Sequence, residues 1–122
     1  MGGKRFRELV KLALDSLPSE FAQKLDNVEV VVENDPTSDQ IRELKLSKDD
    51  LLFGLYRGVP QTKRGFYSGV LPDKIIIFKN SIEEVAKTEQ EIKEKVIKVV
   101  VHEIGHHFGL SDEELLRPGE DD

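Results

Sequence analysis

The segment EQEIKEKVIKVVVHEIGHH, residues 89–107, decides the expected fold because it joins a long amphipathic pattern to the three histidines of the chain. Apolar residues recur along it at the spacing of one helix face, at Ile92, Val96, Val99 and Val100. Gly109 lies two residues after the last histidine and is a typical helix stop. The pattern therefore predicts one helix from about Glu89 to His107.

Two of the histidines, His102 and His106, are spaced for binding one metal ion. Residues i and i+4 of an α-helix lie about 40° apart around the axis, so both imidazoles project from the same face. Glu103 lies about 100° round from His102, at the edge of that face, where a carboxylate reaches a water bound to the metal. This HExxH pattern is typical of a zinc site in which the two histidines are ligands and the glutamate is the general base.

A third protein ligand is expected after the helix. Gly109 allows the chain to reverse through a positive φ, which can bring Asp112 back towards the ion. HEIGHHFGLSD matches the pattern HExxHxxGxx(H/D), and three protein ligands with one open position define a catalytic zinc site. We predict one Zn²⁺ ion bound by His102, His106 and Asp112, with Glu113 or water as the alternatives to Asp112. A solvated, histidine-rich helix end is the competing interpretation.

Other polar residues near the motif receive no catalytic role. His107 lies about 100° beyond the second ligand, so we interpret it as partly exposed, or as a hydrogen-bonding partner behind the ligands. Four side chains in or beside the glycine-rich stretch could help to stabilise an oxyanion: Tyr56, Arg57, Arg64 and Tyr67. Tyrosine and arginine frequently cover apolar surface without any such role, so none of them is assigned to the site.

The composition of the chain limits the number of domains, the binding partners and the metal ligands that are possible. The 122-residue chain is long enough for a single core, and we expect one domain over residues 1–122. A net charge of −6 disfavours nonspecific binding to nucleic acid or to anionic membranes. The chain has no cysteine, so a metal must be bound by His, Asp or Glu. No signal peptide or membrane-spanning run is recognisable, and we expect a cytoplasmic protein.

The rest of the sequence predicts an α+β fold, with helices packed on a small mixed sheet. Helices are expected over 4–15, shortly after Pro18, and from Ser81, where Ser81 and Glu84 form a capping-box pattern. Strands are expected over 28–34, 51–59 and 74–80, the last buried on both faces. For residues 35–50 we expect at most one helical turn, near Gln40–Leu44. We expect residues 60–74 to form a functional loop and residues 117–122 to form a frayed tail.

Four stretches in order, residues 13–36, 52–62, 69–80 and 99–115, resemble the minimal zincin family of small bacterial metallopeptidase-like proteins. The resemblance implies a zincin-like fold with the zinc-site helix near the C-terminus, crossing beneath the sheet. It also implies the same roles for the histidines, the aspartate and the glutamate of the motif. The only methionine is Met1, so the chain lacks the Met-turn of the larger metzincins.

The resulting functional prediction is a zinc metallopeptidase. Zn²⁺ activates a water for attack on a peptide carbonyl, and Glu103 moves the proton to the leaving amine. Zincins usually hold the substrate as an added strand on a sheet edge, expected here within residues 66–78. The partner is therefore a peptide or protein substrate, and the oligomeric state is left open. Two alternatives remain: a metal-dependent RNA hydrolase, and a zinc-binding module of zincin fold without catalytic activity.

Overall fold

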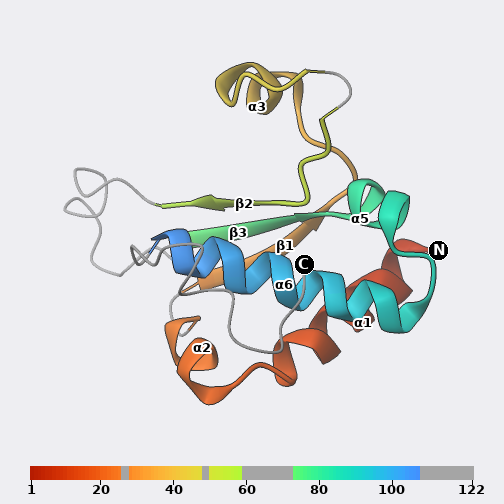
Figure 1. Ribbon diagram of the computed structural model, residues 1–122, viewed down its shortest axis with the longest axis vertical. Coiled ribbons are helices and arrows are strands. Elements are labelled where there is room, and N and C mark those ends of the chain that lie inside the picture. Colours follow the sequence, from red (N-terminus) through yellow and green to blue (C-terminus); the bar gives the residue numbers. More distant parts are fainter. Residues whose placement is uncertain (26–27, 48–49, 59–72, 108–122) are drawn as a thin grey trace.

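The computed structural model describes residues 1–25, 28–47, 50–58 and 73–107, with side chains up to Gly105 in the last range. The elements follow the order α1 (Gly3–Asp15), α2 (Ser19–Lys24), β1 (Val28–Glu33), α3 (Ser38–Glu43), β2 (Gly54–Arg57), β3 (Asp73–Phe78), α5 (Lys79–Val85) and α6 (Glu89–His107). Figure 1 shows α1, α2 and α6 on one side of the sheet and α3 on the other. The predicted α+β class with a long helix near the C-terminus is confirmed.

The described strands form a three-stranded mixed sheet in the order β1-β3-β2. The central strand β3 pairs in parallel with β1 and antiparallel with β2. Ile75, Ile77 and Phe78 are 0% exposed, which confirms the prediction of a strand buried on both faces. Such a strand has neighbours on both sides, so the prediction of a substrate-binding edge within 66–78 is wrong for residues 73–78. Among the described strands, β1 and β2 are the edges of the sheet.

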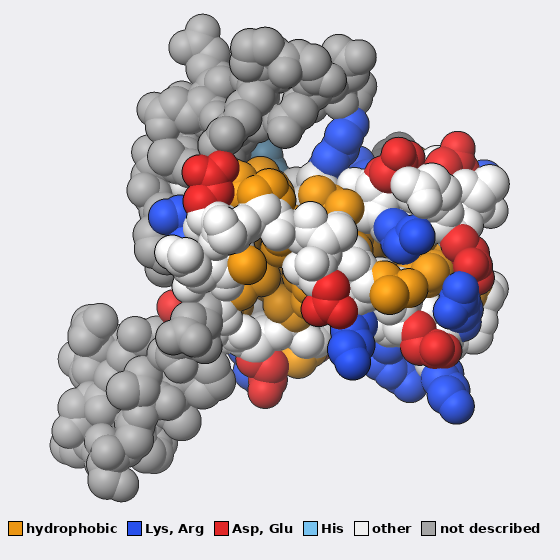
Figure 2. Space-filling model, turned by 90° about the horizontal axis from the view of Figure 1, so that it is seen from below, with side chains coloured by type: hydrophobic (Ala, Val, Ile, Leu, Met, Phe, Trp, Pro, Cys, Tyr) orange, Lys and Arg blue, Asp and Glu red, His pale blue; other side chains and the backbone are white. Residues whose placement is uncertain are grey.

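The core lies between the sheet and the helices α1 and α6. On the face shown in Figure 2, apolar side chains lie between charged ones. Side chains from α1 (Phe6, Leu9, Val10, Ala13), from β3 (Ile75, Ile77) and from α6 (Ile92, Val96, Val99, Val100, Ile104) are buried together in the core. All four residues of the predicted apolar stripe of α6 are in this group. Burying that stripe fixes the rotation of α6, and so decides which of its residues face the sheet.

A capping box begins α6, and it was not predicted from the sequence. The backbone N–H of Glu91 donates to Thr88 Oγ1 at 3.1 Å, and Glu91 Oε1 accepts from the N–H groups of Thr88 at 3.1 Å and Lys87 at 2.8 Å. The hydrogen bonds from Lys87 and Thr88 lower the pKa of the Glu91 carboxyl. These bonds satisfy amide groups that have no partner within the helix and define its first turn.

The expected capping box at Ser81 and Glu84 is wrong. The strand β3 leads directly into α5 at Lys79, and Ser81 lies inside the helix and is buried. The helix start is instead held by the segment after β1, because the N–H of Asn80 donates to the carbonyl of Asn34 at 3.0 Å. A partner distant in sequence replaces the local cap, which no local pattern can predict.

The short elements differ from expectation mainly in their bounds. The predicted turn near Gln40–Leu44 is the helix α3, and it carries a capping box between Thr37 and Gln40. Strand β2 is shorter than the predicted 51–59. Most of the predicted loop 60–74 and the whole tail 117–122 lie outside the described residues. No helix in the described ranges is both long and apolar enough to span a lipid bilayer.

Candidate active site

The site helix α6 crosses beneath β2 at very close range. Gly54 is buried, and a Cβ placed on it would lie 2.4 Å from Val99 Cγ1 and 3.8 Å from Glu103 Cγ. Ordinary carbon–carbon contacts are about 3.5–4.0 Å, so there is no space for a side chain at residue 54. This glycine therefore allows the edge strand to approach the part of α6 that carries Glu103.

The peptide groups of Gly54 and Tyr56 point away from β3. Gly54 pairs with Ile77 and Tyr56 with Ile75, while the N–H of Phe78 bonds to the carbonyl of Phe53. Opposed residues of an antiparallel pair alternate between bonded and non-bonded pairs, so residues 54 and 56 are the non-bonded ones. Their N–H and C=O groups consequently face the outer edge of β2, which is open in the sense that no other described strand pairs with it.

Glu103 contacts this open edge directly. Its carboxylate Oε1 accepts a hydrogen bond from the backbone N–H of Tyr56 at 3.2 Å, and its side chain is half-buried. A backbone amide that donates to a carboxylate favours the charged form of the acid and fixes its orientation. The predicted general base therefore lies where the helix and the strand edge meet.

The predicted metal ligands are only partly described. His102 and His106 are both in α6, four residues apart, so their backbone positions are one helical turn apart. The side chain of His102 is exposed at the surface. The side chains of His106 and His107, and Asp112 as a whole, lie outside the described residues. Among the described side chains, no three His, Cys, Asp or Glu residues are grouped as a metal site.

The donor chemistry at this place nevertheless fits zinc. A continuous helix presents histidines one turn apart, and imidazole and carboxylate are both good zinc ligands. The chain has no cysteine, so no thiolate competes for the ion. Glu103 follows His102 directly and is held by the strand instead of pointing along the helix. A metal bound to the histidines would have this carboxylate beside it.

A second acidic residue near this edge, Asp73, was not singled out from the sequence. Its side chain is 9% exposed, and Asp73 Oδ2 accepts a hydrogen bond from the Tyr56 hydroxyl at 2.8 Å. Tyr56 thus contacts one carboxylate through its backbone and another through its side chain. The sequence signal was weak, because Asp73 begins an otherwise apolar strand and its tyrosine partner lies on a neighbouring strand.

The remaining candidate side chains are not brought to Glu103 by the described structure. Arg57 forms an ion pair with Glu43 of α3, with Nη2 and Oε2 2.5 Å apart. The hydrogen bond from Arg57 lowers the pKa of the Glu43 carboxyl. This guanidinium is therefore engaged with α3. Arg64 and Tyr67 lie outside the described residues.

Comparisons with known proteins show the family and the fold of the chain. Residues 25–119 match the family described as Zincin-like metallopeptidase. A solved structure of a conserved hypothetical protein from Thermo thermophilus is similar over 88% of this chain and 94% of that chain, with 23% identity and a TM-score of 0.56. That likeness concerns the fold alone. No curated protein matches significantly. The match of the family to most of the chain shows that it belongs to the zincin-like metallopeptidases.

Proposed function

We propose that the chain is a zinc-dependent peptidase in which Glu103 is the general base. The observation that carries this proposal is the position of Glu103, half-buried beside His102 and hydrogen-bonded to the open edge of β2. General-base catalysis requires a carboxylate close to both the attacking water and the substrate. The edge strand provides a place for the substrate, and the helix provides the base.

In this proposal His102, His106 and Asp112 bind one Zn²⁺ ion. When bound, zinc lowers the pKa of a water molecule and polarises the substrate carbonyl. The two histidines come from consecutive turns of α6, and the aspartate from the segment that follows it. Three protein ligands leave one position open, as catalysis requires.

The protein side chains and peptide groups perform the other steps. Glu103 accepts the proton of the attacking water and donates it to the amine that leaves. An extended substrate pairs with the outward peptide groups of Gly54 and Tyr56, forming a further strand on β2. A substrate carbonyl that accepts from the Tyr56 N–H replaces Glu103 Oε1 there. Loss of this hydrogen bond allows the carboxylate to turn towards the water.

Zinc content and peptide hydrolysis, measured on the same preparations, test the proposal. The variants His102→Ala and Asp112→Ala should lose stoichiometric zinc, whereas Glu103→Gln should keep it. Glu103→Gln should slow cleavage of a quenched peptide library by about 10²–10⁴-fold, the usual contribution of a general base. Glu94→Gln is the matched control, because Glu94 is an acid of the same helix outside the motif. Zinc-loaded Glu103→Gln with wild-type hydrolysis would refute the assignment.

The same preparations separate the two alternatives. A single-stranded RNA oligonucleotide should stay intact under conditions in which the peptides are cleaved. Cleavage of the RNA, with the peptides intact, would favour the metal-dependent RNA hydrolase. A wild-type protein that binds stoichiometric zinc and cleaves neither substrate would favour the non-catalytic zinc-binding module.

A further inference from the structure

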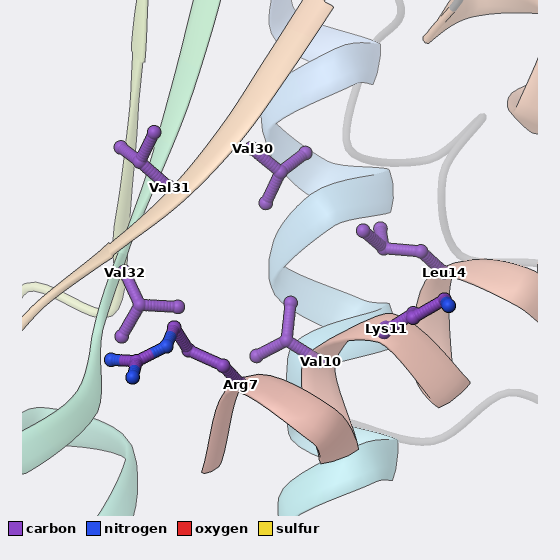
Figure 3. A pocket seen from close by; sticks show the side chains of 7 residues that line it. All are labelled: Arg7, Val10, Lys11, Leu14, Val30, Val31 and Val32. Atoms are coloured by element: carbon purple, nitrogen blue, oxygen red, sulfur yellow. The ribbon is translucent and has the colours of Figure 1, made fainter. Parts of the chain in front are cut away.

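A groove lies between α1 and β1, at the sheet edge opposite β2 (Figure 3). It has a volume of about 370 Å³ and is lined by Arg7, Val10, Lys11, Leu14 and Val30–Val32. Ligand-binding pockets are commonly about 300–1,000 Å³, so the groove is large enough to take part of a ligand. Apart from two cationic side chains, its lining is apolar.

The groove follows the open edge of β1. Successive residues of a strand point to opposite faces of a sheet, yet the three consecutive residues Val30–Val32 line one groove. A groove of this kind runs along the strand edge instead of over one face. In the described ranges β1 pairs with β3 alone, so its remaining peptide groups are directed to the groove side. Such an edge can accept another strand.

The two cations of the groove, Arg7 and Lys11, have no ion pair or hydrogen bond with any other described residue. They are one turn apart on α1, and Figure 3 shows the guanidinium of Arg7 extending towards Val32. By contrast, Arg5 of the same helix binds Glu89 through two hydrogen bonds of 2.7 Å. In a chain of net charge −6, unpaired cations beside an open strand edge favour an acidic ligand.

The two faces of β1 differ in charge. Val30 and Val32 pack against the core and are on the side of α1, so Glu29, Val31 and Glu33 are on the opposite face. An added strand would therefore meet cations on the α1 side, and carboxylates flanking a valine on the other. Acidic side chains suit the first face and uncharged apolar ones the second.

A second copy of the chain does not suit this edge. In an antiparallel pairing of two β1 strands centred on Val31, Glu29 of each copy would lie opposite Glu33 of the other. Like charges directly opposite one another destabilise a strand pair. This repulsion disfavours a second β1 strand in that pairing and favours an occupant of different sequence. We propose that the groove binds an extended segment of a partner protein in which acidic and apolar residues alternate, added as a strand to β1.

Fluorescence anisotropy with the full chain tests this proposal, using a labelled, capped peptide of alternating Glu and Val. The double variant Arg7→Glu and Lys11→Glu should weaken binding by about tenfold or more, and should gain binding to the matching Lys and Val peptide. The control is Lys45→Glu with Lys98→Glu, two exposed lysines that do not line the groove. It changes the net charge equally and should alter affinity by less than about twofold.

A second measurement tests the pairing with the strand edge. The peptide is N-methylated at alternate residues, in two complementary patterns, and only one pattern should abolish binding, since one set of amides faces β1. Equal effects of both patterns would overturn the proposal. So would equal weakening by both double variants, or stronger binding of single-stranded RNA than of the acidic peptide. If the Glu variants fail to fold, Arg7→Gln with Lys11→Gln gives the same comparison. None of these measurements depends on zinc or on hydrolysis.

Discussion

The close contact between β2 and α6 leads to a specific prediction for Gly54→Ala. The new Cβ would lie 2.4 Å from Val99 Cγ1 and 3.3 Å from the carbonyl oxygen of Ile76. The first distance is more than about 1 Å shorter than an ordinary carbon contact. Valine in a helix has one strongly preferred rotamer, so its methyl group cannot turn away easily. The strand must move instead.

We expect Gly54→Ala to lower the free energy of unfolding by about 1–3 kcal/mol, the usual cost of overpacking a close-packed contact. Val99→Ala removes the atom that clashes, and alone costs about 1–3 kcal/mol as a core truncation. The double variant should therefore be less destabilised than the sum of the two single variants, by about 1 kcal/mol or more. Urea unfolding followed by circular dichroism measures all three values.

The control is Gly2→Ala, because a Cβ on Gly2 meets no atom within 4 Å. It should change stability by less than about 0.5 kcal/mol. Displacing β2 should also expose the N–H of Tyr56, which now donates to Glu103, so its hydrogen exchange should become faster. If the loss of stability in the double variant equals the sum of the losses in the two single variants, the steric reasoning is refuted. A lower free energy of unfolding without a change in exchange at residue 56 would refute the link to the site.

Three further substitutions test other parts of the structure by the same unfolding assay. Thr88→Ala removes the side-chain cap of α6 and should lower the free energy of unfolding by about 1 kcal/mol, with faster hydrogen exchange in the first turn of the helix. An unchanged stability would show that the cap does not stabilise the helix. Ile75→Ala truncates a side chain that is 0% exposed and should lower the free energy of unfolding by about 2–5 kcal/mol. The control Leu12→Ala truncates a side chain that is 49% exposed and should lower it by less than about 1 kcal/mol. Similar losses at both positions would contradict the core described above. Tyr56→Phe removes a hydrogen-bond donor from the buried side chain of Asp73 and should cost about 1–3 kcal/mol, and an unchanged stability would contradict a contribution of this bond.

The features that could be predicted from the sequence are those that depend on residues close together along the chain. The period of apolar residues in 89–107 determines both the helix and its buried face, and the structure confirms both. The start of α5 was not predictable in this way, because Asn80 finds its partner at Asn34 on another part of the chain. The expected substrate edge was wrong at residues 73–78 for the same reason, since a strand order of β1-β3-β2 does not follow from any single strand.

The candidate site likewise has one part that the sequence predicts and another part that only the fold brings together. The spacing of His102, Glu103 and His106 is local, and it was sufficient to suggest the family that the comparisons then showed. The other half of the site, the edge of β2, is 47 residues away from Glu103 in sequence, and only folding brings Tyr56 to it. The motif therefore predicts the metal chemistry but not how a substrate is positioned. A single glycine, Gly54, connects the two parts, because any larger residue would separate the edge strand from the helix that carries Glu103. A chain with an intact motif and a side chain at this position should accordingly still bind zinc but cleave peptides more slowly.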